Sequence, residues 1–276
     1  MPKFLSQSQI DQYHRDGCLF PITVMSEKKA YQYEQRLAGA EKAYPKELNA
    51  HNRNNAHLVF PFLDEIVRHP LILDIVEDLI GEDILVWGSV LFVKEPQSAG
   101  HVTWHQDYTY MGLAPHDGVS VWIALTPSNK DSGCMQILPG SHLEGIHPHR
   151  DSFGKDNILT RGQTIDGLDV SNALDVLLAP GQISLHHPRV IHGSDPNRSD
   201  YRRVGFTIQT YLPPHVRSTK SVGHAMLVRG KDRGRHHQLL AQPTFEMEPE
   251  GVAVRAQVNK IRETVLYEGS DGKRRC

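Results

Sequence analysis

Two histidines and one aspartate in this chain have the residue types and spacing of a metal-binding site. His105 and Asp107 are two positions apart in the segment Trp104-His105-Gln106-Asp107. On an extended segment, their side chains project from the same face. With the distant His192 they form a set of two imidazoles and one carboxylate, which can cap one face of an octahedral metal and leave the opposite face open. Such a facial triad is associated with non-haem Fe(II) oxygenases.

An arginine beyond His192 adds a second part to the expected site. Arg203 follows His192 by eleven residues and would supply a fixed positive fork for a carboxylate cosubstrate. Neighbours on a strand face opposite ways, so Arg202 and Arg203 cannot both point inward. We expect Arg203 to share a small, polar inward face with three residues and to have an apolar face behind it. The inward residues are Gly205, Thr207 and Gln209, and the outward ones are Val204, Phe206 and Ile208.

The surroundings of the His-x-Asp pair carry more weight than the pair itself, because the chain has 17 histidines and chance pairs are expected. A strand-like run, Val119–Leu125, follows the pair and leads to a turn rich in Asn, Asp, Ser and Gly. A second short strand, Met135–Leu138, then runs into Pro139-Gly140-Ser141-His142. This order favours a ligand pair over a chance neighbour.

These segments resemble a known family. WHQD, VWIALTPSNKDSGCMQILPGSH and HHPRVIHGSDPNRSDYRRVGF are similar to the phytanoyl-CoA dioxygenase family of Fe(II)/2-oxoglutarate oxygenases, and the similarity extends more loosely between Ile10 and Tyr211. The residues after Tyr211 carry no motif of the family. The resemblance implies Fe(II), 2-oxoglutarate and O2 as cofactor and cosubstrates. It also implies a double-stranded β-helix, the jelly roll or cupin-like fold.

The resemblance assigns roles to individual residues. It favours His192 over His186 and His187 as the third ligand, because His192 precedes Gly193-Ser194 and has the family's spacing to Arg203. His105, Asp107 and His192 would then be the catalytic metal ligands, and Arg203 with Ser194 would bind the far carboxylate of 2-oxoglutarate.

Other positions have two interpretations. Trp122 either lines the cosubstrate slot or packs in the core, and Lys94 either reaches the slot or ends its strand in solvent. Arg53 and His57 are weaker candidates for the cosubstrate end. The basic run Arg229–His237 is either a solvated loop or a lid over an anionic substrate.

The reaction implied by the resemblance is hydroxylation, with succinate and CO2 as coproducts. Related halogenases carry a small residue where this chain has Asp107, so halogenation is disfavoured, whereas desaturation and epimerisation stay open. A non-catalytic jelly-roll binding module and a redox-silent metal enzyme are the alternatives of a different class.

The expected substrate is small, polar and anionic. We expect four side chains to contact it: His101, Tyr108, Gln136 and His187. Arg150, Arg161 and Arg189 lie in nearby loops, and these surroundings are more polar than a pocket for a bare fatty chain. The chain also resembles the bacterial 2-aminoethylphosphonate dioxygenases, which implies hydroxylation of the carbon next to phosphorus. An amino-acid-like or secondary-metabolite substrate is the alternative.

Composition agrees with one enzyme domain spanning residues 1–276, of which 39% are hydrophobic. A net charge of -2 gives no reason to expect a nucleic-acid partner. Three widely spaced cysteines suit a reducing compartment better than disulfides. No run is long enough to span a membrane, and the polar start predicts a cytoplasmic protein.

The order of expected elements predicts a mainly β protein with helical buttresses. Helices are expected at 6–16, 26–44 and 70–80, each with a capping residue or a proline at its start. From Ile84–Lys94 onward, short strands dominate, and a last helix is expected at 252–267. The predicted parts are a helical stretch (1–82), a β-helix core (83–212) and a C-terminal loop and helix (213–276).

Overall fold

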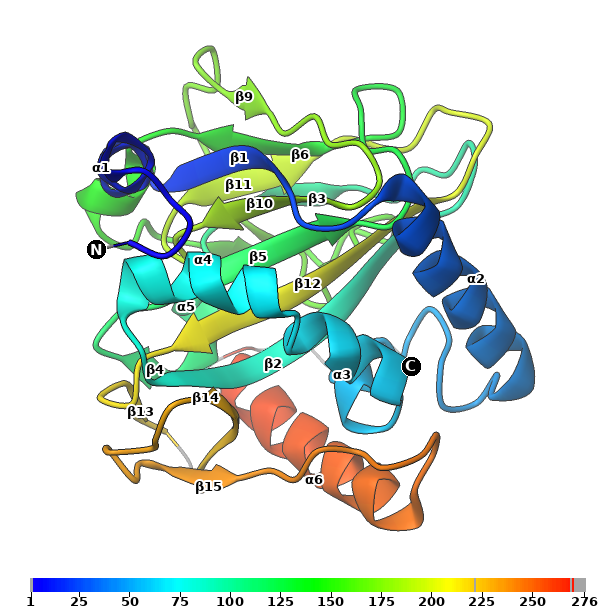
Figure 1. Cartoon of the computed structure of the whole chain (residues 1–276). Helices are drawn as coiled ribbons and strands as arrows, with labels where there is room; N and C mark the ends of the chain where they lie inside the picture. The colour runs from blue at the N-terminus through cyan, green and yellow to red at the C-terminus, as the bar shows by residue number, and fades with distance from the viewer. Residues whose placement is uncertain (1, 221, 269, 271–276) are drawn as a thin grey trace.

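Two antiparallel sheets face each other in the computed structural model, which describes residues 2–220, 222–268 and 270 (Figure 1). The larger sheet has the strand order β1-β10-β5-β12-β2-β14-β15, antiparallel except for the β14–β15 pair. Its strands are β1 (Cys18–Thr23), β10 (Gln182–His186), β5 (Val119–Ala124), β12 (Arg203–Leu212), β2 (Ile84–Lys94), β14 (Gly223–Arg229) and β15 (His237–Leu239).

The smaller sheet has the order β3-β11-β6-β9. Its strands are β3 (Val102–His105), β11 (Ile191–Ser194), β6 (Met135–Leu138) and β9 (Leu174–Asp175). Two further strand pairs lie in the connecting loops: β13 (Arg217–Ser218) with β4 (Leu113–Ala114), and β7 (Arg150–Asp151) with β8 (Gln163–Thr164). The two facing sheets give the expected jelly roll.

Helices cover the outer face of the larger sheet, with α3 and α4 lying across it in Figure 1. The helices are α1 (Gln7–Asp16), α2 (Glu27–Ala43), η1 (Ala56–Leu58), α3 (Pro61–Val67), α4 (Pro70–Ile80), α5 (Tyr108–Met111), η2 (Ser141–Glu144) and α6 (Pro249–Leu266). Their starts follow the sequence signals: Ser6 caps α1 in a capping box, Ser26 caps α2, and proline begins α4.

Successive side chains along the central strands of the larger sheet point to opposite faces, so they belong to two separate core clusters. Val204, Phe206 and Ile208 of β12 are fully buried against the helices, in the same cluster as Ile72 and Ile75 of α4. A second cluster joins residues of β5, such as Trp122, to residues of β6 in the opposite sheet. The inward face of β12 is therefore the one that carries Arg203, as the sequence predicts.

Strands from all three predicted parts share the larger sheet. β1 lies in the stretch expected to be helical, and β14 and β15 lie in the stretch expected to be a loop and a helix. The internal Pro21 makes β1 look unlike a strand in sequence, and the strand indeed occupies an edge, where a missing backbone N–H is tolerated.

The basic run 229–237 is bound to the outside of the molecule. Arg229 Nη1 lies 2.7 Å from Asp74 Oδ1 and 2.9 Å from Glu77 Oε2, both on α4. Arg233 Nε lies 2.6 Å from Asp83 Oδ2. These cations are neutralised by carboxylates of the helical side, which argues against the lid interpretation.

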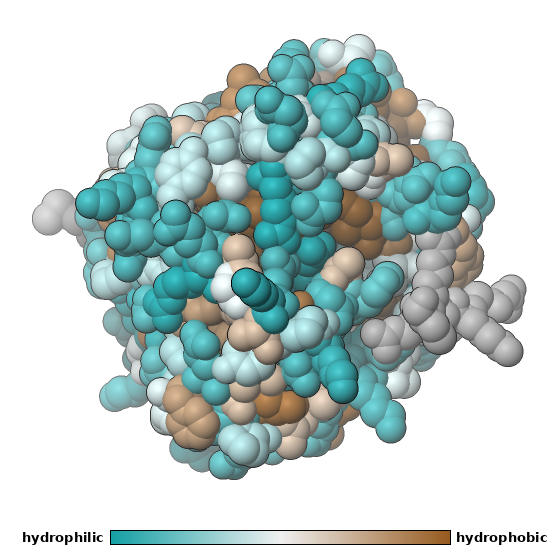
Figure 2. Space-filling view, turned by 90° about the vertical axis from the view of Figure 1, so that its right-hand side faces the viewer, coloured by the Kyte–Doolittle hydropathy of each residue, from teal (hydrophilic) through white to brown (hydrophobic). Residues whose placement is uncertain are grey.

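The surface turned to the viewer in Figure 2 is largely hydrophilic, and its hydrophobic residues form small separate patches. Single exposed apolar residues of this kind are normal on protein surfaces. Among the described helices, none has both the length and the apolar character needed to cross a bilayer.

Candidate active site

Three side chains at one end of the sandwich form a group of metal-binding donors. His105 ends β3 and pairs with His192 of β11, while Asp107 is the N-cap residue of α5. One ligand atom from each lies within 4.8 Å of the other two. His105 Nε2 is 3.3 Å from Asp107 Oδ1, and His192 Nε2 is 3.9 Å from the same oxygen. The sequence-predicted triad is therefore assembled by the fold.

Backbone carbonyls determine which ring nitrogen faces this group. His105 Nδ1 lies 2.9 Å from the Thr103 carbonyl, and His192 Nδ1 lies 3.1 Å from the Val190 carbonyl. A carbonyl only accepts, so each Nδ1 carries the proton and each Nε2 keeps a free lone pair. Burial, with His105 next, lowers the pKa of His192 to about 3. The imidazole is thus neutral, as a metal ligand must be, and the donor set fits Fe(II).

A fourth imidazole borders the triad. His186, at the end of β10, is 2% exposed, and its Nε2 lies 3.9 Å from Asp107 Oδ2. Its ring is 5.1 Å from that of His192, and its Nδ1 is buried with no hydrogen-bond partner among the described residues. The adjacent HH dipeptide was the only sequence signal, and it did not show which histidine would face Asp107.

Deeper between the sheets, two cations converge on one carbonyl. Lys94 Nζ donates to the Gly133 carbonyl at 3.2 Å and to Ser194 Oγ at 2.8 Å. Arg203 Nη1 donates to the same Gly133 carbonyl at 3.1 Å, and its guanidinium lies 5.3 Å from the ring of Trp122. We call Lys94, Trp122, Ser194 and Arg203 the cosubstrate end. All four predicted cosubstrate residues are thus brought together.

The two basic side chains of the cosubstrate end have no acidic partner among the described residues. Lys94 is 1% exposed and Arg203 is 2% exposed, and their hydrogen bonds within the described ranges go to uncharged oxygens. Arg203 Nε and Thr207 Oγ1 are buried there without partners. Burial, with Arg203 next, lowers the pKa of Lys94 to about 6. Since buried charges need a counter-charge, this slot fits a bound carboxylate such as the far end of 2-oxoglutarate.

The absence of a side chain at Gly205 makes room for Trp122, which forms one wall of the slot. Thr207 and Ser184 are the cross-strand neighbours of Trp122, whose ring lies over Gly205. A Cβ at Gly205 would come within 1.9 Å of this ring. The glycine therefore allows the indole to lie flat against β12, beside the Arg203 guanidinium.

Two residues predicted to contact the substrate, Gln136 and His101, have their hydrogen-bond partners away from the triad. For Gln136 the structure corrects the prediction. Met135 and Ile137 fill the inter-sheet core, so Gln136 points to the other face, where Nε2 donates to Asp175 Oδ1 at 3.0 Å. His101 Nδ1 contacts the Ala99 carbonyl at 3.3 Å, and no hydrogen bond or ion pair among the described residues joins His101 to the triad.

The two weaker candidates for the cosubstrate end have partners outside it. His57 Nδ1 lies 2.6 Å from Ser89 Oγ, and Arg53 Nη2 lies 3.5 Å from Glu41 Oε1. Tyr108 and His187, by contrast, lie close to each other beside the triad, with ring centroids 6.2 Å apart.

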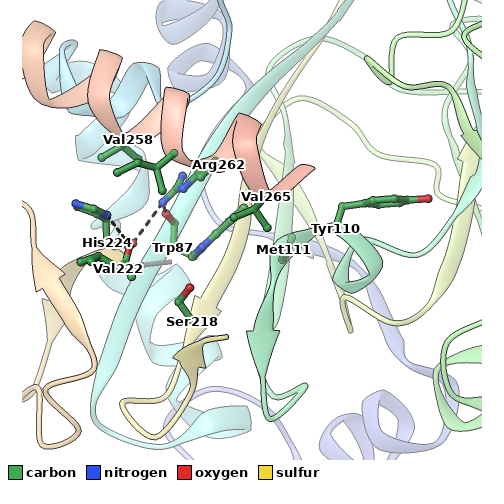
Figure 3. A pocket seen from close by; sticks show the side chains of 11 residues that line it. Trp87, Tyr110, Met111, Ser218, Val222, His224, Val258, Arg262 and Val265 are labelled. Atoms are coloured by element: carbon green, nitrogen blue, oxygen red, sulfur yellow. Dashed lines mark hydrogen bonds between the residues drawn. The ribbon is translucent and has the colours of Figure 1, made fainter. Parts of the chain in front are cut away.

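A small pocket beside α5 is closed by the last helix (Figure 3). Arg262 of α6 lies 4.1 Å from the Trp87 ring and donates to Asn55 Oδ1 at 2.7 Å. Tyr110 and Met111 of α5 also line this pocket. Its volume of ≈ 20 Å³ holds about one water molecule, and no triad residue lines it, so it is not the substrate site.

A facial His-Asp-His group at the end of a jelly roll, with an unneutralised cationic slot behind it, defines a cosubstrate-dependent non-haem iron oxygenase. The model of the family described as Phytanoyl-CoA dioxygenase matches residues 1–205. The chain belongs to the phytanoyl-CoA dioxygenase family. This confirms the family predicted from the sequence, and the donor set and the slot described above fit Fe(II) and 2-oxoglutarate.

Individual relatives agree with this assignment. The chain is 31% identical over 185 residues to a probable alpha-ketoglutarate-dependent hypophosphite dioxygenase of Stutzerimonas stutzeri. That match covers 66% of this chain and 62% of the relative, so it spans less than two thirds of the relative's length. The solved structure of ThoJ, described as a non-heme monooxygenase, is 31% identical, with a TM-score of 0.85 over 94% of this chain and 98% of ThoJ.

A more distant structure shows the shared fold. CytC3, solved with Fe(II) and alpha-ketoglutarate, is 22% identical and has a TM-score of 0.67, covering 88% of this chain and 96% of CytC3. The predicted jelly roll is therefore confirmed.

Proposed function

We propose that this chain uses Fe(II), 2-oxoglutarate and O2 to hydroxylate a small phosphorus oxyanion, with 2-aminoethylphosphonate as the specific candidate. The observation that carries the proposal is the pairing of the His105-Asp107-His192 group with two buried cations, Lys94 and Arg203, that have no carboxylate partner in the described residues. A non-catalytic binding module would need neither part.

The reaction balances with one cosubstrate molecule. Substrate R–H, 2-oxoglutarate and O2 give R–OH, succinate and CO2, and the bound iron supplies the oxidising chemistry. The chain's own residues orient the reactants: Arg203 and Ser194 bind the far carboxylate by charge-assisted hydrogen bonds, which are roughly twice as strong as neutral ones. Lys94 adds a second positive charge when the bound carboxylate favours its protonated form, and the Trp122 ring forms one wall of the slot.

Asp107 is expected to offer one oxygen to the metal. Its Oδ1 faces His105 and His192, whereas its Oδ2 faces the Nε2 of His186 at 3.9 Å. If this separation shortened to a hydrogen bond, His186 would orient the carboxylate that is to hold the metal. The carboxylate at position 107 also favours hydroxylation over halogenation.

Two observations support a phosphorus oxyanion. The Stutzerimonas stutzeri relative is named for hypophosphite, a small anion of this class. The side chains next to the triad, Tyr108 and His187, are polar or aromatic, unlike the lining expected for a fatty chain. An amino-acid-like or secondary-metabolite substrate is the second candidate.

The proposal is tested by adding Fe(II) and 2-oxoglutarate without oxygen, and then oxygen with each of several candidate substrates. We expect a visible metal-to-ligand absorption band, followed by succinate formation that 2-aminoethylphosphonate or hypophosphite stimulates. Asp107→Ala should abolish the band, whereas Asp166→Ala, in an exposed pair with Arg150, should keep it.

The outcomes separate the parts of the proposal. The absence of a band with folded wild-type protein and bound iron would overturn the cosubstrate assignment. A band without succinate stimulated by any phosphorus oxyanion would refute the substrate class and direct the search to amino-acid-like compounds.

A further inference from the structure

A second group of side chains, basic and aromatic, lies beside the triad. It comes from α5, the loop after α5, η2 and the turn between β10 and β11. We call it the mouth cluster: Tyr108, His116, His142, His187 and Arg189. The rings of Tyr108 and His116 are stacked with centroids 4.9 Å apart, and those of His142 and His187 are 5.3 Å apart.

Hydrogen bonds hold the mouth cluster against the metal-binding segment. Tyr108 follows Asp107 directly, and its backbone N–H donates to the Pro188 carbonyl at 3.1 Å. Gln106 Nε2 donates to the Arg189 carbonyl at 2.6 Å. The turn that carries Arg189 is therefore fixed to the segment between His105 and Tyr108.

Arg189 is a cation without an anion. Its Nε is buried and has no hydrogen-bond partner, and no ion pair of the described chain includes it. Other loop arginines do have partners: Arg150 pairs with Asp166 at 2.8 Å and Arg161 with Asp151 at 2.6 Å.

The imidazoles around Arg189 are neutral. Burial, followed by the neighbouring His142 and Arg189, lowers the pKa of His187 to about 3. Burial, followed by Arg189, also lowers the pKa of His116. Of the carboxylates near the cluster, Asp107 belongs to the triad, Asp117 Oδ2 lies 2.9 Å from His215 Nε2, and Asp16 pairs with Arg15 at 2.7 Å. At neutral pH the cluster therefore has one uncompensated positive charge among neutral polar rings.

We propose that Arg189, with the imidazoles of His116 and His187, binds the oxyanion group of the substrate. The inference rests on the proposed function and gives its substrate a binding site. A guanidinium binds two oxygens of a tetrahedral phosphorus oxyanion at once, and neutral imidazoles donate further hydrogen bonds to the same group. The proximity of the cluster to Asp107 places the bond to be hydroxylated beside the metal.

The experiment uses the full chain with Fe(II) and 2-oxoglutarate under anaerobic conditions. Methylphosphonate, hypophosphite and acetate are titrated separately, and the shift of the visible absorption band reports binding. We expect the two phosphorus oxyanions to bind more tightly than acetate. Arg189→Gln should weaken them at least about tenfold, as expected for one charge-assisted hydrogen bond, and Arg189→Lys should weaken them less.

Controls and outcomes separate this inference from the proposed function. Arg150→Gln removes an equally charged residue and should leave the titrations with methylphosphonate and hypophosphite as in the wild type. If the 2-oxoglutarate band never forms, the proposed function fails. If the band forms but Arg189→Gln and Arg150→Gln bind the oxyanions as the wild type does, or no oxyanion shifts the band, this site is refuted. His116→Gln provides a second variant if Arg189→Gln does not fold.

Discussion

The cosubstrate end and the mouth cluster are built from different kinds of structure. The four side chains of the cosubstrate end come from regular strands of the two sheets, whereas the mouth cluster comes from two short helices, a loop and a turn. Hydrogen bonds to neighbouring strands on both sides fix the position of a strand residue, whereas the sequence of a loop can change without disturbing the sheets. The comparison indicates that this chain keeps cosubstrate recognition in its sheets and places substrate recognition in its connections.

The largest expected effect is the loss of the charge at the cosubstrate end. Arg203→Gln should weaken 2-oxoglutarate binding by roughly 2–5 kcal/mol, because the buried carboxylate loses its fork. Arg202→Gln is the matched control, since Arg202 faces the other way and pairs with Glu41 at 2.7 Å. Anaerobic titration of the absorption band measures both. Equal losses in the two variants would show that the inward face of β12 is wrongly assigned.

A smaller effect is expected beside the triad, at His186. His186→Leu should weaken Fe(II) binding roughly 10- to 100-fold, the usual cost of losing a partner of a metal ligand. His186→Gln keeps an N–H donor and should recover part of the affinity. Competition with a chelator measures both constants without turnover. Wild-type affinity in His186→Leu would contradict the proposed role.

The next effect concerns packing at the cosubstrate end. Gly205→Ala forces a methyl group into the Trp122 ring and should lower the free energy of unfolding by about 1–3 kcal/mol. It should also weaken 2-oxoglutarate binding. Gly39→Ala, in α2 with no atom near its added Cβ, should instead stabilise the protein. Urea unfolding compares the two, and a neutral Gly205→Ala would show that Trp122 can move freely.

The smallest effect is a pH dependence carried by Lys94. Burial, with Arg203 next, lowers the pKa of this amine to about 6, and Asp195 and Cys134 are its other titratable neighbours. At pH 8 the free protein therefore holds Lys94 neutral, and a bound carboxylate favours its charged form. Binding of 2-oxoglutarate then takes up a proton, and affinity falls as pH rises above about 6, by at most about tenfold per pH unit.

Calorimetry in two buffers of different ionisation enthalpy measures this proton uptake, which Lys94→Met should remove. The same shift makes stability of the free protein rise with pH between about 6 and the ordinary lysine pKa of about 10.4, because the unfolded chain binds the extra proton. A pH-independent affinity in the wild type would contradict the prediction.

The sequence predicted the parts of the molecule that local patterns determine. The bounds of α4, β2 and β6 agree with the expected ranges, because proline, glycine and alternation mark them clearly. The His-x-Asp motif and the spacing to Arg203 led to the triad and the cosubstrate end. β1 was missed because Pro21 interrupts its pattern.

The sequence could not predict contacts that depend on how loops meet. Gln136 looked like a site residue from its closeness in sequence to the motifs, but strand alternation turns it outward to Asp175. The contact of His186 with Asp107 and the mouth cluster both depend on the turn at 187–190 meeting α5. Such a meeting leaves no periodic signal in the chain.

Because α6 is made last, one early loop of the chain cannot be anchored until synthesis is nearly complete. Arg255 of α6 donates to the carbonyls of Glu47, Asn52 and Asn54, each at 2.9 Å, so a late segment anchors an early loop. A chain emerging from the ribosome has both sheets' cosubstrate residues by Leu212, well before α6 is made. A chain that ends before α6 would thus contain all the site residues but lack the helix that anchors the loop between Glu47 and Asn54.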